Sequence, residues 1–337
     1  FERWGKIQNS KLKIQNFGKT IFCNSGFEAV EAALKTVFLA TGKNEIIAFA
    51  GAYHGLGYGA LNATHREHFR SPFRAQLREL AHFVPFPKQI RQLEKLEKEI
   101  RRLFLQKNIG AILVEPVQAR GGINIPPKEF LSLLRELCDR HKVLLILDEI
   151  FTGFGRTGKW FACEHSKTIP DLICLGKALS GGFPISACVG RADLMDAAWP
   201  ISRGEAIHTS TFLGHPVGCA MALAQIAEIK NLKLVERSAA LGKFLLEELS
   251  STQNSKFKIQ NSVRGLGLAV GMELRNRDGS PATELCLLTI KKLLQRGFIL
   301  LPEGEHANVI SFTPPLTISR NDLANTVREL SKVLNSQ

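Results

Sequence analysis

Short apolar runs alternate with stretches of helical periodicity along most of the chain. Residues 46–49, 144–147 and 172–175 are apolar runs of the length that a buried strand takes, and residues 111–115, which are apolar up to Glu115, are expected to form another. Between them, apolar residues recur every three or four positions, which is the spacing of a helix that buries one face. Strands separated by helices predict an α/β fold with a mainly parallel sheet and helices on both of its faces.

The first of these helices is expected to begin after a turn at Asn24, Ser25 and Gly26. The buried stripe that its spacing predicts consists of Ala29, Val30, Ala33, Val37 and Phe38. A helix N-terminus presents free N–H groups and a positive dipole end, so it can bind a phosphate, although most such turns bind nothing.

The pattern changes at about residue 222. A long amphipathic helix over residues 225–250, a glycine-containing strand region at 263–274 and a helix over 283–295 indicate a second, small α+β domain. A short polar motif occurs at residues 6–16 and again at 255–262, and we interpret both copies as insertions, because no globular repeat architecture has this layout. The expected organisation is an atypical N-terminal remnant at residues 1–19, a large domain at 20–221 and a small C-terminal domain at 222–337.

The composition is that of a chain with a large core, since 45% of its 337 residues are hydrophobic. The seven cysteines are scattered singly with no CxxC pair, so they are expected to be reduced core thiols, and no metal site is expected. The sequence has no uninterrupted apolar run of membrane-spanning length, and its first residues lack the apolar centre of a signal peptide. We therefore expect a cytoplasmic protein with no membrane partner.

The net charge of +13 raises the alternative of a nucleic-acid-binding protein. The Lys and Arg residues are spread along the chain, however, and in residues 88–102 glutamates interleave with them on the polar side of an amphipathic helix. We therefore expect no nucleic acid partner. The positive balance suits small anions such as a phosphate-bearing cofactor and carboxylate substrates.

Two of the predicted strands end on residues that can support covalent chemistry. Asp148 and Glu149 follow the run at 144–147, and Lys177 follows the run at 172–175. An isolated acid at a strand end is more often a solvated residue, but the carboxyl ends of strands in an open α/β sheet are where ligands bind. A carboxylate and an amine at one edge are the pair that pyridoxal 5'-phosphate (PLP) chemistry requires. The lysine forms the Schiff base, and the carboxylate keeps the pyridine nitrogen protonated.

Six blocks of the sequence, beginning at Phe22, carry a resemblance to a known family. In order they are FCNSGFEAVEAALK, GAYHG, VEPVQARGG, LDEIFTGFGRTG, PDLICLGKALSGG and HTSTFLGHP. With these blocks the chain resembles the class III aminotransferases, the fold-type-I PLP enzymes that include the 4-aminobutyrate, acetylornithine and other ω-amino acid aminotransferases. The resemblance implies a large PLP-binding domain, a small C-terminal domain and a missing N-terminal segment.

The resemblance also implies which residues hold the cofactor. These are Ser25, Gly26 and Phe27 at its phosphate, Tyr53 and Ile150 on the two faces of its pyridine ring, His54 beside Tyr53, Glu115, Asp148 at the pyridine nitrogen, and Lys177 as the Schiff-base lysine. Thr211 is implied to reach the phosphate held by the other subunit of a homodimer. Phe27 stands where the family usually has a small or hydroxylated residue, and Phe151 where many members have glutamine, so those side-chain contacts are expected to be lost.

The implied activity is transamination with ping-pong kinetics, in which Lys177 also moves the proton. The amino donor is expected to be an ω-amino acid or amine, similar to 4-aminobutyrate, and the acceptor an oxo acid such as 2-oxoglutarate. An acetylornithine-type aminotransferase or another class III PLP enzyme is an alternative. A further alternative is a truncated, non-catalytic remnant, because family members carry more chain ahead of the FCNSG block.

Two departures from the family's pattern concern the substrate. Many ω-aminotransferases have a glutamate where Arg120 stands and an arginine where Ser311 stands, and that arginine binds the α-carboxylate of glutamate or 2-oxoglutarate. Arg120 is therefore either a solvent-facing loop residue beside a pocket that has lost carboxylate binding, or a clamp that binds the carboxylate from the opposite side. The second interpretation is the one to test, because a guanidinium group is well shaped to bind a carboxylate through two hydrogen bonds.

Overall fold

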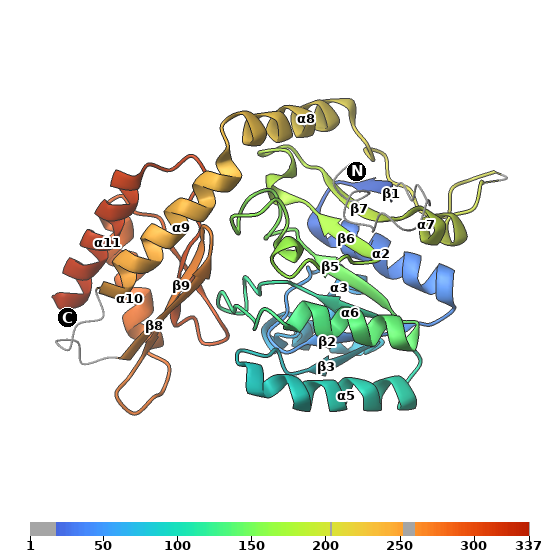
Figure 1. Ribbon diagram of the computed structural model, residues 1–337, viewed down its shortest axis with the longest axis horizontal. Helices are drawn as coiled ribbons and strands as arrows, with labels where there is room; N and C mark the ends of the chain where they lie inside the picture. The colour runs from blue at the N-terminus through green and yellow to red at the C-terminus, as the bar shows by residue number, and fades with distance from the viewer. Residues whose placement is uncertain (1–17, 203, 252–259, 337) are drawn as a thin grey trace. The chain divides into compact units, whose positions relative to one another are not determined.

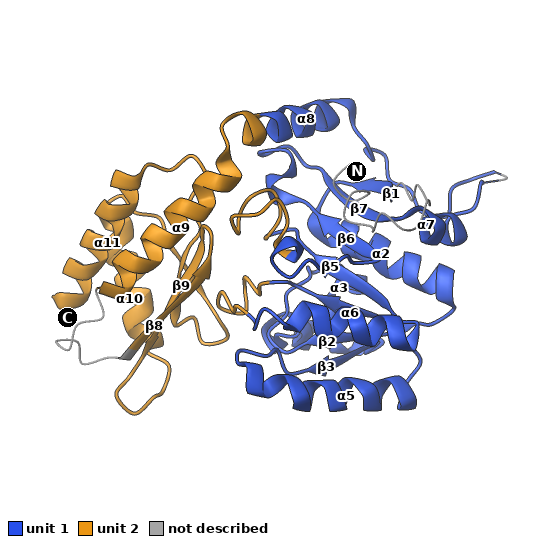
Figure 2. Cartoon of the chain, in the orientation of Figure 1, with its two compact units in different colours: residues 1–116, 126–151, 163–227 blue, residues 117–125, 152–162, 228–337 orange. Residues whose placement is uncertain are grey.

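The computed structural model describes residues 18–202, 204–251 and 260–336 (Figure 1). The chain divides into two compact units (Figure 2). Unit 1 comprises residues 1–116, 126–151 and 163–227, and unit 2 comprises residues 117–125, 152–162 and 228–337. Two loops that precede the expected domain boundary thus cluster with the C-terminal unit. The polar motif at residues 6–16 and most of its copy at 255–262 lie outside the described residues.

Unit 1 is built on a sheet of seven strands in the order β1-β7-β6-β5-β4-β2-β3. Strands β6, β5, β4, β2 and β3 run parallel to one another, whereas β7 is antiparallel to both β6 and β1, so the expected mainly parallel α/β sheet is confirmed. Its elements are β1 (Gly18–Cys23), α2 (Gly26–Thr41), β2 (Glu45–Phe49), α3 (Tyr58–Ala63), α4 (Glu67–Arg70), η1 (Ser71–Gln76), β3 (Ala81–Val84), η2 (Ile90–Gln92), α5 (Leu93–Gln106), β4 (Ile109–Val114), α6 (Phe130–His141), β5 (Leu144–Asp148), β6 (Leu172–Leu175), η4 (Lys177–Leu179), β7 (Ser186–Arg191) and α7 (Ala192–Ala198).

Helices cover both faces of this sheet. On one face, Ile146 of β5 and Cys174 of β6 belong to the hydrophobic cluster that includes Ala29 and Ala33 of α2. On the other, the ring of Phe49 in β2 packs edge-on against Phe130 of α6, with the ring centres 5.3 Å apart. Successive side chains of a strand point to opposite faces, so these contacts place α2 and α6 on opposite sides of the sheet.

The buried stripe of α2 includes all the predicted residues except Phe38, and it also includes Ala32 and Thr36. Ala29, Ala33 and Val37 are buried as expected, but Phe38 is 53% exposed. At 100° per residue, Phe38 lies about 180° around the helix from Ala29, so its side chain points away from the buried stripe. Thr36 is buried instead, and its hydroxyl donates a hydrogen bond to the carbonyl of Ala32.

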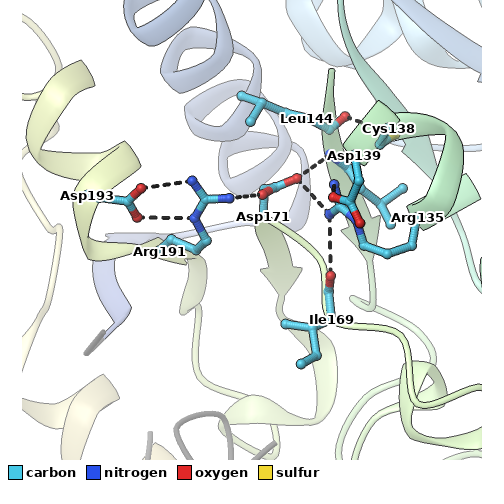
Figure 3. Close-up of polar contacts among 9 residues, drawn as sticks. Arg135, Cys138, Asp139, Leu144, Ile169, Asp171, Arg191 and Asp193 are labelled. Carbon is cyan, nitrogen blue, oxygen red and sulfur yellow. Dashed lines mark hydrogen bonds and ion pairs between the residues drawn. The ribbon is translucent and has the colours of Figure 1, made fainter. Parts of the chain in front are cut away.

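A buried carboxylate ties the beginnings of the central strands together (Figure 3). Asp171, which directly precedes β6, accepts hydrogen bonds from the backbone N–H of Leu145 and from Nη1 of Arg135, both at 2.8 Å, and from Arg191. Burial alone lowers the pKa of Arg135, but the charge and hydrogen bond of Asp171 outweigh it and raise that pKa. Asp171 thereby joins β5, β6, α6 and β7.

Unit 2 contains an antiparallel sheet in the order β10-β11-β9-β8, which α9, α10 and α11 cover (Figure 1). Its elements are α9 (Leu234–Ser251), β8 (Gln260–Leu266), β9 (Ala269–Arg275), α10 (Thr283–Gln295), β10 (Leu301–Glu303), β11 (Val309–Phe312) and α11 (Arg320–Asn335), while α8 (Pro216–Asn231) and η3 (Ala162–His165) span the divisions between units. Val270 and Met272 of β9 and Ile310 of β11 pack with the helices in one apolar cluster.

The helix expected over residues 225–250 is two helices. Helix α8 ends at Asn231 and α9 begins at Leu234, and Lys233 between them has a left-handed backbone with φ 51°. A left-handed residue cannot continue a right-handed helix, so the chain changes direction there. The helix predicted over residues 283–295 coincides with α10.

All seven cysteines are free, and all but Cys219 are buried. Among the helices of the described residues, none has the combination of length and apolar composition that a membrane span needs.

Candidate active site

The predicted acid and lysine follow two adjacent parallel strands. β5 ends at Asp148, which is buried and lies opposite Cys174 in the register with β6. β6 ends at Leu175, and Lys177 opens the short helix η4 two residues later. Because parallel strands end at the same edge of a sheet, the structure places both residues at one edge of unit 1, as the sequence pattern predicted.

The turn expected to hold the phosphate lies between β1 and α2. The carboxylate of Glu28 accepts hydrogen bonds from the backbone N–H groups of Asn24 and Ser25, at 2.6 and 3.0 Å, which fixes the turn. The hydroxyl of Ser186 donates to the carbonyl of Ser25 at 2.6 Å. The buried hydroxyl of Ser25 itself has no hydrogen-bond partner within the part of the chain that the structure describes. The turn therefore presents an uncommitted hydroxyl beside the free N–H groups of a 16-residue helix.

Two glycines bring this turn against the residues that follow β5 and β6. A Cβ atom added to Gly26 would lie 3.0 Å from Cδ1 of Ile150. One added to Gly176 would lie 3.4 Å from Cγ2 of Ile150 and 3.8 Å from Cα of Gly26. The turn, Ile150 and the residue before Lys177 thus meet at one point.

Tyr53 and His54 follow β2 and reach the same edge. The N–H of Tyr53 donates to Oε1 of Glu115 at 3.0 Å, and the Tyr53 ring packs edge-on against Phe69. The imidazole of His54 is fully buried, with Nδ1 2.7 Å from Oδ2 of Asp148. The other carboxylate oxygen of Asp148 accepts the N–H of Ile150 at 3.1 Å. The carboxylate is thus held in one orientation by two contacts.

The two phenylalanines that depart from the family pattern have defined places. Phe27 packs against the GAYHG turn, because a Cβ atom added to Gly55 would lie 2.3 Å from the Cβ of Phe27. The Nζ atom of Lys177 lies 6.0 Å from the centre of the Phe151 ring, within cation–π range. Lys177 also has a left-handed backbone, with φ 38°.

Thr211 is exposed on the loop between α7 and α8. Its neighbour Ser210 accepts a hydrogen bond from the side-chain amide of Asn24 at 3.3 Å, so this loop lies beside the turn that precedes α2.

Arg120 and Ser311 both belong to unit 2. Ser311 is buried on β11 opposite Leu301 and Gly271. The Arg120 carbonyl accepts the N–H of Gly304 at 3.1 Å, and Nη1 of Arg120 lies 3.9 Å from Oε2 of Glu303. Leu301 lies directly opposite Ser311, so the two side chains share one face of the sheet. Glu303 is two residues after Leu301 on β10 and therefore lies on that same face.

Sequence reasoning did not single out Glu303 or Ser186. Each acts through a residue far away in the sequence, Arg120 and Ser25 respectively, so no local motif could have indicated them.

The family assignment follows from comparison with known proteins. Residues 4–334 match the profile of the family described as Aminotransferase class-III. The chain belongs to the class III aminotransferases. The putrescine aminotransferase of Pectobacterium atrosepticum is 37% identical over 328 residues, covering 95% of this chain and 66% of that enzyme. Ornithine aminotransferase 1 of Staphylococcus aureus is 36% identical over 338 residues, covering 98% of this chain and 79% of that enzyme.

Solved structures agree with this assignment. An amine transaminase from an uncultivated Pseudomonas species, crystallised in its PLP-bound form, has a TM-score of 0.84 and 27% sequence identity, and covers 94% of this chain and 77% of its own. The chain thus spans about two thirds to four fifths of the length of the aminotransferases that it matches. Class III aminotransferases use PLP as their cofactor.

The residues of this class III chain fit that cofactor. The uncommitted Ser25 hydroxyl and the free N–H groups of α2 suit its phosphate, and the oriented Asp148 carboxylate suits a protonated ring nitrogen. No group of three or more His, Cys, Asp or Glu residues in the described ranges is arranged to hold a metal ion.

Proposed function

We propose that this class III chain transfers an amino group from an ω-amine or ω-amino acid to an oxo acid with PLP, and that Lys177 and Asp148 are its catalytic residues. The observation that carries the proposal is the convergence of Gly26, Ile150 and Gly176. It supports a cofactor that spans the helix turn and the lysine, because the residue before Lys177 lies against that turn.

The bound cofactor would act as an electron sink for the carbanion that forms when the donor carbon loses a proton. Lys177 would hold the cofactor and, once the donor amine displaces it, carry that proton on Nζ as general base and acid. Asp148 would keep the ring nitrogen protonated, and His54 would hold the carboxylate in place through the 2.7 Å contact.

The other cofactor contacts follow the geometry of unit 1. Ser25, Gly26 and the N–H of Phe27 would bind the phosphate at the start of α2. Tyr53, whose N–H is fixed by Glu115, and Ile150 would cover the two faces of the ring.

The donor is proposed from the relatives. Putrescine and ornithine, which name two of them, both carry a terminal primary amine, as 4-aminobutyrate does. A terminal amine is therefore the shared chemistry, and 4-aminobutyrate or a related ω-amino acid is our proposed donor, with an acetylornithine-type substrate as the alternative. The proposed acceptor is 2-oxoglutarate or a similar oxo acid.

Arg120 is proposed to bind the carboxylate of the acceptor. Its side chain is 48% exposed, so it can meet a substrate, and Glu303 at 3.9 Å provides a counter-charge when no carboxylate is present. Ser311 lies on the same side of the small sheet and adds no charge there. A guanidinium and an acid would thus share one side of unit 2, in place of the arginine that many ω-aminotransferases have where Ser311 stands.

We further propose a homodimer in which Thr211 reaches the partner's cofactor. Thr211 is exposed, and Phe212 next to it is 61% exposed. Phe38, Leu39 and Ile207 line an apolar hollow of about 560 Å³ on unit 1. These three side chains are exposed, and exposed large apolar side chains that gather in one hollow support burial against another chain. The cytoplasmic location that we propose rests on the seven free cysteines.

The test of the central proposal is covalent labelling. Purified protein should take up PLP and, after borohydride reduction, yield one pyridoxyl-labelled peptide that contains Lys177. Lys177→Arg should fold and remain unlabelled. Labelling at another lysine would refute the assignment, and a folded wild-type sample that takes up no PLP would favour the non-catalytic alternative.

A further inference from the structure

A single buried hydroxyl holds the turn that carries Tyr53 and His54. Thr64 follows α3 and is fully buried. Its Oγ1 accepts the backbone N–H of His54 at 2.9 Å and donates to the carbonyl of Gly55 at 2.9 Å. Both hydrogen-bonding capacities of the hydroxyl are therefore used on consecutive residues of one turn.

The turn has little freedom to relax if this hydroxyl is lost. Gly55 has a left-handed backbone with φ 117°, and Phe27 lies directly against it. On the other side, the N–H of His65 donates to the carbonyl of Ala52 at 2.9 Å. The backbone N–H of Thr64 donates to the carbonyls of Ala60 and Leu61, which holds Thr64 itself at the end of α3.

The effect of the hydroxyl extends to the acid of the active site. The His54 peptide sets the position of an imidazole that is fully buried and whose Nδ1 contacts Asp148 at 2.7 Å. The second ring nitrogen, Nε2, is buried and has no hydrogen-bond partner among the described residues, so it gives the ring no other anchor. The orientation of the ring thus depends on its backbone and on Asp148.

We infer that Thr64 is a positioning residue, which fixes the His54 peptide so that the imidazole supports the Asp148 carboxylate. The two hydrogen bonds of the Thr64 hydroxyl go to the backbone of His54 and Gly55, so among the expected cofactor contacts they reach His54 alone. Of the two tests of this inference, only the measurement of PLP binding rests on the proposed function.

The test compares Thr64→Val with a matched control. Valine keeps the shape of threonine and removes the hydroxyl. Thr36→Val is the control, because Thr36 is equally buried and its hydroxyl also makes two hydrogen bonds, to the Ala32 carbonyl and from the Trp199 indole. Both variants lose one buried hydroxyl with two partners, but only Thr64 contacts the GAYHG turn.

Two readouts are measured on full-length protein. The first is hydrogen–deuterium exchange of a peptide covering His54 in the apo protein, and the second is the dissociation constant of PLP from absorbance titration. A lost hydrogen bond of ordinary strength predicts about a 3- to 10-fold faster exchange in Thr64→Val and a similar rise in the PLP dissociation constant. Thr64→Ser, which restores the hydroxyl, should return both values toward wild type.

Equal changes in Thr64→Val and Thr36→Val would overturn the inference, since they would show a general loss of stability. No change in Thr64→Val, or no recovery in Thr64→Ser, would overturn it as well. If Thr64→Val does not accumulate as folded protein, Thr64→Ala removes the same hydroxyl and is judged by the same comparison. If wild-type protein fails to bind PLP, the proposed function fails, while the exchange comparison still decides the role of Thr64.

Discussion

Replacing Asp171 by alanine should destabilise unit 1 by about 3 kcal/mol. The side chain is 3% exposed and accepts from the Leu145 N–H, from Arg135 and from Arg191. Breaking a buried ion pair by removing one partner costs about 3 to 5 kcal/mol. The lower end of this range applies here, because both arginines keep an ion pair in the variant. Arg191 still pairs with Asp193, at 2.8 Å, and Arg135 still pairs with Asp139.

The assay is urea unfolding followed by far-ultraviolet circular dichroism, with exchange of the peptides of β5 and β6 as a local readout. Asp193→Asn is the control, since Asp193 pairs with the same Arg191 but is 55% exposed, and exposed pairs contribute about 0 to 1 kcal/mol. Asp171→Asn should fall between the two, because the amide oxygen still accepts one N–H. A loss in Asp171→Ala no larger than that in Asp193→Asn would refute the reasoning.

Three further outcomes are expected. Arg120→Ala should raise the KM for 2-oxoglutarate by roughly 10- to 100-fold, the equivalent of losing one charge-assisted contact, and an unchanged KM would mean that Arg120 does not bind the acceptor. Burial raises the pKa of the Cys23 and Cys286 thiols to about 12, so the unfolded chain loses these protons near pH ~8.5 while the folded state keeps them. The stability that these protonated thiols contribute is complete below that pH and is lost as the pH rises toward 12. Between those pH values, the free energy of unfolding, measured by urea titration, should therefore fall less in Cys286→Ala than in wild type. An equal fall in the two proteins would contradict this. Gly55→Ala should cost more stability than Gly279→Ala, because both glycines have positive φ but only Gly55 has a close neighbour, and equal urea midpoints would show that backbone strain alone decides.

The sequence was most informative where local pattern and position coincide. Asp148 and Lys177 could be placed at one edge of the sheet because each follows an apolar strand and parallel strands end together. The helix over residues 283–295 was predictable for a similar reason, since its periodicity is uninterrupted.

What the sequence did not show depends on contacts between distant residues or on a single backbone angle. Phe38 is exposed although Val37 is buried, and the two differ by only 100° of rotation around the helix. When adjacent residues are both apolar, the sequence does not show which of them faces the core. The break before α9 depends on Lys233, whose type does not favour a left-handed backbone. The approach of Arg120 to Glu303 depends on a loop that packs on a sheet formed much later in the chain.

The loop at residues 117–125 limits how unit 2 can fold during synthesis and how it can be transferred to another protein. The carbonyls of Gly122 and Ile123 accept hydrogen bonds from Arg264 of β8, and Ile123 packs where Gly271 leaves room. Residues 117–125 and 152–162 leave the ribosome well before the C-terminal segments of unit 2 that they contact, so the unit can be completed only after nearly the whole chain has been synthesised. A fragment cut at residue 228, or a chimera joined there, would carry the small sheet with one side uncovered. Grafting this unit between relatives therefore requires moving three separate segments together.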